Sequence, residues 1–256
     1  MKKLCSPLAA LILAALLPAA LAQTPPPEAA PAAHPHPDAS AATPKTDKGQ
    51  FLKRHESFLA RAQAGSIGLL FLGDSIMDNW RTRAPKIWED NYGKYQTANF
   101  GIGGDTTQNV IWRIANGELD GIHPRVVVLM IGTNNSASNT PEEIFAADKK
   151  IVNLIREKIP ETKVLLLAIF PRGKRQNTNG TPDNYVLRMS VIRPTNDLLA
   201  TLDDGKNVRY LDIGSKFFGP DGQIPDTIMS DHLHPTAAGY QIWVDAMQPL
   251  LDEMMR

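Results

Sequence analysis

The chain has 256 residues, of which 43% are hydrophobic and 21% charged, and these values suit one or two globular domains. Its 27 Lys and Arg residues balance its 27 Asp and Glu residues, so no overall field would draw it to nucleic acid or to an acidic membrane. The single cysteine, Cys5, excludes an internal disulfide and a site built from several thiolates.

Residues 1–22 have the pattern of a signal peptide. Lys2 and Lys3 precede an apolar stretch at residues 8–17, and Ala20-Leu21-Ala22 forms a small-x-small cleavage pattern. An uncleaved anchor is the alternative, but a membrane span needs roughly 20 apolar residues. We therefore expect an exported protein, periplasmic or secreted, with no cysteine and no stable membrane span after cleavage.

Residues 23–48 have the composition of a linker, with seven Pro and seven Ala among 26 residues and no apolar periodicity. Such a segment favours an extended, disordered spacer rather than part of a core. His34 and His36 could be a metal pair, but two histidines in a flexible tail are more often incidental. We therefore expect no metal here.

Residues 49–256 alternate between strand-like and helix-like runs. Apolar runs typical of strands occupy residues 67–72, 97–100, 126–131, 164–170 and 208–213. Helical spacing occupies residues 51–64, 80–88, 107–115, 141–159, 187–202 and 236–254. Near-continuous apolar strands separated by helices predict a parallel sheet covered on both faces. We predict a single three-layer α/β domain over residues 49–256, with a mostly parallel, flavodoxin-like sheet.

Polar or glycine-rich segments follow three of these strands. They are Gly73-Asp74-Ser75, Gly101-Ile102-Gly103-Gly104-Asp105 and Gly132-Thr133-Asn134-Asn135, and Asp231-His232-Leu233-His234-Pro235 precedes the last helix. Ligands of open parallel sheets bind outside the carboxyl ends of the strands. The four segments therefore predict one site at this rim.

The histidines at this rim are His232 and His234; the other four lie in the tail, on the first helix or at the opposite end of the sheet. Asp231 lies three residues before His234, close enough for a turn to bring its carboxylate to one ring nitrogen. The other nitrogen could then take a proton from a hydroxyl. Pro235 suggests the first position of the last helix, which would place His234 at its N-cap.

A serine hydroxyl is a weak nucleophile without an adjacent base, and acyl transfer needs donors for the oxyanion. Gly104 suits that role because a glycine N–H can approach a substrate without side-chain obstruction. Asn134 suits it because its amide is a neutral donor.

The rim segments resemble the four blocks of the SGNH, or GDSL, hydrolases. The longer runs are closest in pattern to the catalytic subunits of intracellular platelet-activating-factor acetylhydrolase; these runs are Asn99-Phe-Gly-Ile-Gly-Gly-Asp-Thr-Thr-Gln, Trp112-Arg-x5-Glu118-Leu119, Gly132-Thr-Asn-Asn and Phe170-Pro-Arg-Gly. The resemblance implies that Ser75 is the nucleophile and His234 its base, oriented by Asp231. It also implies an oxyanion hole of the Ser75 N–H, the Gly104 N–H and the Asn134 side chain, with no cofactor.

Other interpretations of the same segments are weaker. A dinucleotide loop starting at Gly101 would need glycine where Thr106 stands, and the G-x-S-x-G elbow fails at Met77. Asp105 is better explained as a cap of the following helix, and Asp74 as support for the turn around Ser75. A divalent metal on Asp74, Asp231, His232 and His234 would leave the serine, glycine and asparagine unexplained, so we expect none.

These features predict an exported serine esterase that cleaves short acyl groups, acetyl above all, from O-acetylated carbohydrate or another small ester. The alternatives are a lipid-directed esterase or lysophospholipase, and a non-catalytic carbohydrate-binding module that retains the fold. The loop Arg172 to Arg175 could contact the alcohol side of the substrate or be merely solvated. A role for Asn135 and the oligomeric state do not follow from the sequence.

Overall fold

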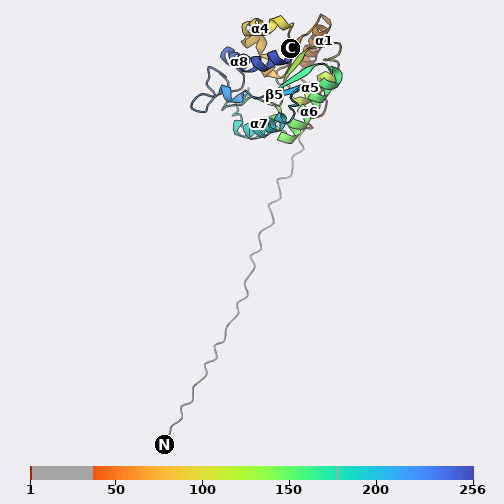
Figure 1. Cartoon of the computed structure of the whole chain (residues 1–256). Coiled ribbons are helices and arrows are strands. Elements are labelled where there is room, and N and C mark those ends of the chain that lie inside the picture. Colours follow the sequence, from red (N-terminus) through yellow and green to blue (C-terminus); the bar gives the residue numbers. More distant parts are fainter. Residues whose placement is uncertain (2–36, 178) are drawn as a thin grey trace. The chain divides into compact units, whose positions relative to one another are not determined.

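The computed structural model describes residues 1, 37–177 and 179–256 (Figure 1). One unit spans His36–Arg256. Apart from Met1, the expected signal peptide at residues 1–22 lies outside the described residues, as do residues 23–36 of the expected linker. Among the described residues, no helix combines the length and apolarity that crossing a membrane requires.

Five parallel strands form the central sheet, in the order β2-β1-β3-β4-β5. They are β1 Leu69–Gly73, β2 Ala98–Gly101, β3 Val126–Met130, β4 Lys163–Leu167 and β5 Val208–Leu211. Every residue of β1 and β3 is buried, as expected for central strands covered on both faces. The predicted flavodoxin-like sheet is confirmed.

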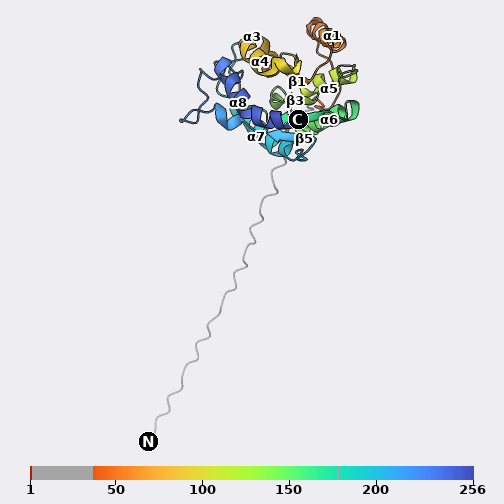
Figure 2. The ribbon, with the colours of Figure 1, turned by 45° about the horizontal axis from the view of Figure 1, so that its top comes forward.

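Helices cover both faces of the sheet. They are α1 Gln50–Gln63, α2 Ser75–Asp78, α3 Trp80–Arg83, α4 Pro85–Tyr92, α5 Thr107–Ala115, α6 Pro141–Lys158, α7 Tyr185–Ala200 and α8 Ala237–Met254, with 3-10 turns at Gly93–Tyr95, Asn135–Ala137 and Gly214–Phe217. Leu70 and Leu72 of β1 pack with α1, α5, α6 and α7. Leu69 and Phe71 pack with α2, α3, α4 and α8. In Figure 2, α8 lies on one side of the sheet and α5 and α6 on the other, which gives three layers.

Helix boundaries follow local capping chemistry. The Thr140 side chain accepts a hydrogen bond from Glu143 N, and the Glu143 carboxylate accepts one from Thr140 N. Pro141 occupies the first turn of α6. The last helix differs from the prediction, because Thr236 is its N-cap and accepts from Gly239 N. His234 therefore lies two residues before the N-cap rather than at it.

Residues 37–48 of the expected linker pack against the domain, which corrects the prediction of a free spacer for this part of residues 23–48. Ala39 is 1% exposed. The main-chain oxygens of Pro37, Ala39 and Thr43 accept hydrogen bonds from the side chains of Asn139, Thr107 and Asn109. We call residues 37–48 the strap. Its docking depends on main-chain acceptors, which its Pro- and Ala-rich composition does not reveal.

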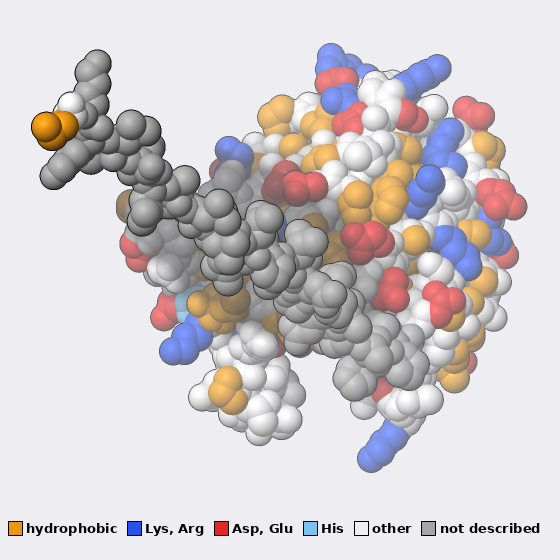
Figure 3. Space-filling model, turned by 90° about the horizontal axis from the view of Figure 1, so that it is seen from below, with side chains coloured by type: hydrophobic (Ala, Val, Ile, Leu, Met, Phe, Trp, Pro, Cys, Tyr) orange, Lys and Arg blue, Asp and Glu red, His pale blue; other side chains and the backbone are white. Residues whose placement is uncertain are grey.

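The surface carries both signs of charge. Figure 3 shows acidic and basic side chains interspersed over the face that it displays. This mixing agrees with the equal numbers of basic and acidic residues.

Candidate active site

Ser75 follows the end of β1 and is the first residue of α2. The side chain of Asp74 caps this short helix by accepting a 2.9 Å hydrogen bond from Ile76 N. The hydroxyl of Tyr240 in α8 donates to Ile76 O at 2.6 Å. The turn that carries Ser75 is thus fixed by its own cap and by a buried tyrosine.

Asp74 has the structural position that the sequence analysis favoured for it. Its side chain is buried, and burial raises its pKa to about 7 although the Ile76 N–H opposes the shift. Gly73 before it is required by packing, because a Cβ there would lie 2.2 Å from Met130 O. Close approach of β1 and β3 therefore excludes a larger residue at this position.

Three residues from two distant segments form a hydrogen-bonded chain. Ser75 Oγ lies 2.8 Å from His234 Nε2, and His234 Nδ1 lies 2.6 Å from Asp231 Oδ2. Asp231 also accepts from the backbone N–H of His234 at 2.8 Å. The structure therefore brings together the nucleophile, base and orienting acid expected from the sequence.

The Asp231 carboxylate is held in its ionised form. Burial alone would raise its pKa, but hydrogen bonds from the His234 ring and backbone outweigh burial and lower the pKa below its ordinary value. Arg83 lies 3.9 Å from Asp231 and donates to His234 O at 3.2 Å. An ionised Asp231 favours the tautomer in which Nδ1 carries the hydrogen and Nε2 faces Ser75.

His232 has a different environment. Its φ of 52° is left-handed, its Nε2 lies 3.2 Å from Asp226, and its main-chain oxygen accepts from Gly173 N. Among the described residues, no group of three or more Asp, Glu or His side chains is arranged to hold a metal ion.

The loop after β2 passes beside Ser75. A Cβ built on Gly103 would lie 4.0 Å from the Cβ of Ser75. Gly104 follows with φ of +74°, a left-handed conformation in which glycine is favoured. Asn134 Nδ2 donates to Asp105 O at 2.7 Å, so the expected oxyanion donors at Gly104 and Asn134 belong to connected loops.

Asp105 does not cap α5, contrary to the prediction. Thr106 and Asn109 form the capping box of that helix. Asp105 is fully buried and pairs with Arg113 at 2.9 Å and with Lys45 of the strap at 2.7 Å. Burial raises its pKa, and the two cations oppose that shift. The strap cation had no sequence signal, because Lys45 lies in a segment without periodicity.

Arg113 extends this network beneath the site. It is fully buried, pairs with Glu118 as well as Asp105, and donates to Phe100 O at 3.0 Å. It also donates to Gly73 O at 3.4 Å. One guanidinium thereby joins the carboxyl ends of β1 and β2.

Asn135 and Arg172 are buried side chains held by other groups of the protein. Asn135 is buried and accepts from Thr107 N at 3.0 Å, which ties the loop after β3 to the start of α5. Arg172 is 5% exposed and pairs with Asp183 at 2.6 Å. Arg175 instead reaches the triad, 3.8 Å from Asp231.

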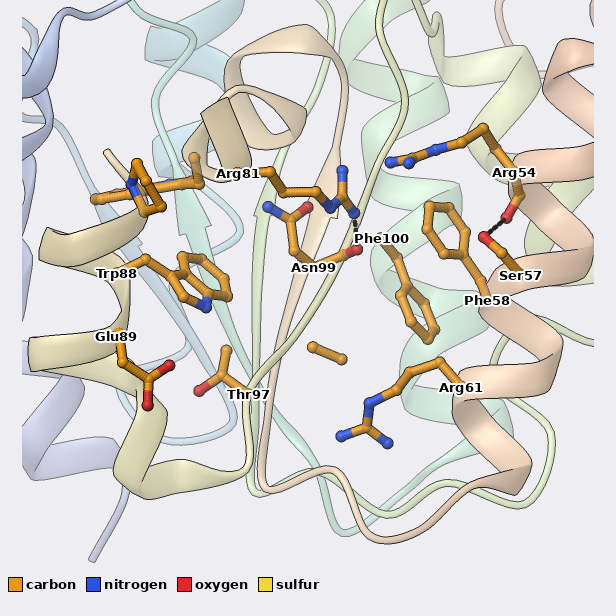
Figure 4. Close-up of a pocket in the computed structure, with 13 residues that line it drawn as sticks. Arg54, Ser57, Phe58, Arg61, Arg81, Trp88, Glu89, Thr97, Asn99 and Phe100 are labelled. Carbon is orange, nitrogen blue, oxygen red and sulfur yellow. Dashed lines mark hydrogen bonds between the residues drawn. The ribbon is translucent and has the colours of Figure 1, made fainter. Parts of the chain in front are cut away.

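Several cavities among the described residues lie outside the triad. Figure 4 shows one of about 480 Å³, with Phe58 and Trp88 on its walls and Arg54, Arg61 and Arg81 around strand β2. Another, of about 340 Å³, is lined by Arg172, Gly173, Tyr185, Val186, Met189, Ser190, Arg193, Phe218, Gly222, Gln223 and Ile224. The second cavity approaches the site through Gly173, whose N–H donates to His232 O.

Comparison with known proteins places this architecture in a family. The model of the GDSL-like Lipase/Acylhydrolase family matches residues 71–242. The platelet-activating factor acetylhydrolase IB subunit alpha2 of Rattus norvegicus is 36% identical over 210 residues, which cover 82% of this chain and 85% of that protein.

Solved structures share the fold at low identity. A GDSL-like lipase from Bacteroides thetaiotaomicron gives a TM-score of 0.62 at 16% identity, over 78% of this chain and 97% of that chain. A carbohydrate acetylesterase family member from Sinorhizobium meliloti gives 0.54 at 17% identity, over 73% and 98%. The chain belongs to the GDSL-like lipase/acylhydrolase family and is a hydrolase of the esterase type.

Proposed function

We propose that the protein is an exported serine esterase that removes short acyl groups, acetyl above all, through an acyl-enzyme on Ser75. The observation that carries this proposal is the chain of contacts from Ser75 Oγ to His234 Nε2 at 2.8 Å and from His234 Nδ1 to Asp231 at 2.6 Å. These distances match a nucleophile, a base and a group that orients the base.

In the acylation step, Ser75 Oγ attacks the ester carbonyl carbon while His234 Nε2 takes the hydroxyl proton. Negative charge develops on the carbonyl oxygen, where the N–H groups of Ser75 and Gly104 and the amide of Asn134 stabilise it. The tetrahedral intermediate collapses, the C–O bond to the alcohol breaks, and His234 returns its proton to the leaving oxygen.

In the deacylation step, water attacks the Ser75 acyl ester while His234 takes a proton from that water. A second tetrahedral intermediate breaks the bond to Ser75 Oγ, which recovers the proton from His234. The carboxylic acid leaves and the resting site is restored. Asp231 remains ionised throughout and stabilises the imidazolium that forms twice per cycle.

The substrate side of the proposal has two sources of support. The alpha2 subunit that resembles this chain is named as an acetylhydrolase, which favours a short acyl group. A fold neighbour is named as a carbohydrate acetylesterase, and the pattern of a signal peptide at residues 1–22 favours a substrate outside the cytoplasm. An O-acetylated carbohydrate fits both.

A lipid-directed esterase is the second candidate. It is favoured by the same 36% identical relative, whose name specifies platelet-activating factor. A non-catalytic carbohydrate-binding module is disfavoured, because such a module would have no reason to keep the Ser75–His234–Asp231 chain.

The test compares nitrophenyl esters from acetate to octanoate with acetate release from acetylated polysaccharide. We expect acetate esters to turn over fastest, and Ser75→Ala to abolish turnover while keeping the melting temperature. Faster turnover of octanoate would favour the lipid-directed esterase. Absence of fluorophosphonate labelling at Ser75 in the folded protein would favour the binding module.

Export is tested separately by fractionation of the native host and N-terminal sequencing. We expect the protein in the periplasm or medium, with Gln23 as its first residue. A protein that retains Met1 in the cytoplasm would contradict export but leave the esterase proposal intact.

A further inference from the structure

Lys45 of the strap contacts the loop that carries Gly104. Its Nζ donates to Gly103 O at 2.6 Å and pairs with Asp105 Oδ1 at 2.7 Å. A Cβ built on Gly104 would lie 3.6 Å from the same nitrogen. One ammonium group therefore holds the residues on both sides of Gly104.

The position of Lys45 is set by the docking of the strap. Upstream of it, Thr43 N donates to Gln108 O at 3.2 Å and Thr43 O accepts from Asn109 Nδ2 at 2.9 Å. The Lys45 side chain itself is 18% exposed. An ammonium with this little solvent and two anionic or carbonyl partners has few alternative positions.

The loop that Lys45 contacts, residues 103–105, is the one that the proposed mechanism requires to be rigid. Gly104 has a left-handed φ of +74°, and Gly103 lies against Ser75. Asp105 O accepts from Asn134 Nδ2, so a shift of Asp105 would also move the expected oxyanion donor at Asn134. Donors act on a transition state only when they are already aimed at the developing charge.

We propose that Lys45 is a positioning residue of the active site, which fixes the Gly103–Asp105 loop so that the Gly104 N–H and the Asn134 amide face the oxyanion. The inference rests on the proposed function, since it assigns a role within that mechanism. It makes the strap part of the catalytic apparatus, although the strap supplies no group that touches the reacting atoms.

A purely stabilising role makes a different prediction. Loss of a buried ion-pair partner would then lower the melting temperature and leave turnover unchanged well below it, because Arg113 still pairs with Asp105. In a positioning role, loss of Lys45 lowers kcat while KM stays constant. The donors stabilise the transition state and not the ground state, so misplacing them weakens only transition-state binding.

The test measures kcat and KM for nitrophenyl acetate in the full chain at a temperature well below unfolding. We expect Lys45→Met to lower kcat about 10- to 100-fold with KM within about twofold of wild type. Lys45→Arg keeps a cation with several donors, so we expect its kcat to stay within about threefold of the wild-type value. Should Lys45→Met not fold, Lys45→Gln takes its place under the same criterion.

The matched control is Lys150→Met. Lys150 Nζ donates to Ser40 O at 2.9 Å, so it contacts the strap without touching the Gly103–Asp105 loop. We expect its kcat to equal that of wild type. An equal loss of kcat in Lys150→Met and Lys45→Met would overturn the specific role of Lys45.

Failure of this inference is distinct from failure of the proposed function. If wild type hydrolyses the ester, Ser75→Ala does not, and Lys45→Met matches wild type, then only the positioning role is wrong. If wild type has no activity that depends on Ser75, then the proposed mechanism and the role of Lys45 within it are both wrong.

Discussion

Asn134 Nδ2 donates a 2.7 Å hydrogen bond to the main-chain oxygen of Asp105, and this bond joins the loop after β3 to the loop after β2. A primary amide has two N–H groups, and the bond to Asp105 uses one of them. The direction of the second is then set by the planarity of the amide. The loop after β2 therefore orients a donor that lies in the loop after β3.

Replacement of Asn134 by alanine removes this donor. We expect Asn134→Ala to lower kcat for nitrophenyl acetate by about 10²–10³-fold with little change in KM, because the amide acts on charge that forms in the transition state. Steady-state kinetics measure the effect. The control is Asn139→Ala, which removes a buried amide that donates to Pro37 O of the strap and accepts from Asn135 Nδ2, without a bond to the Gly103–Asp105 loop. A kcat loss below about threefold for Asn134→Ala would contradict the role.

Replacement of Asp231 by asparagine keeps the shape of the acid but not its charge. An amide at this position can donate to Nδ1 and so favours the tautomer that points a hydrogen at Ser75. We expect Asp231→Asn to lower kcat by about 10³–10⁴-fold at neutral pH while the melting temperature stays near that of wild type. Turnover within tenfold of wild type would show that His234 is oriented by other groups.

Loss of Arg113 breaks the buried ion network beneath the site. Arg113→Met would leave the buried carboxylates of Asp105 and Glu118 without the cation that pairs with both of them. We expect the free energy of unfolding to fall by about 3–5 kcal/mol in urea titrations. The matched control is Lys86→Met, whose exposed pair with Asp90 should change stability by less than about 0.5 kcal/mol. Equal effects of the two substitutions would argue against a structural role for the network.

Asp148 is a buried carboxyl on α6, and neither of its oxygens has a hydrogen-bond partner among the described residues. Burial, and secondarily the charge of Asp74, raises its pKa well above 3.8. Above that pH the unfolded chain ionises this group while the folded chain keeps the proton. The folded state therefore binds more protons, and wild-type stability falls as pH rises.

Asp148→Asn removes this titration without changing the shape of the side chain. We expect the stability of Asp148→Asn relative to wild type to increase from pH 4 upward, at no more than about 1.4 kcal/mol per pH unit. Urea titrations at pH 4, 6 and 8 measure the difference. A difference that does not vary with pH would mean that Asp148 is ionised in the folded protein.

Much of the fold could be predicted because its signals are local. The strands are short apolar runs, of which β1 and β2 end at glycine, and the start of α6 carries Thr140, Pro141 and Glu143 at capping positions. The order of the segments after each strand predicted which loops would meet at the rim. Ser75, Asp231 and His234 are together in the structure for that reason, although their catalytic roles stay predictions.

The rest of the site depends on contacts that no local pattern encodes. Asp105 was expected to cap a helix because it precedes one, but Thr106 is the cap and Asp105 pairs with two distant cations. The strap docks in large part through main-chain groups, which every sequence has, so its composition indicated only a spacer.

The arginines around the cavity of Figure 4 affect the tendency of the protein to associate with other copies of itself. Strand β2 is at one edge of the sheet, and an edge strand can recruit a strand from another molecule. Arg81 donates to Asn99 O, and Arg54 donates to Gly101 O at 3.3 Å. An incoming strand would have to displace these cations from the carbonyls it needs. The edge is thereby protected against sheet growth between molecules, and the protein should resist aggregation at high concentration.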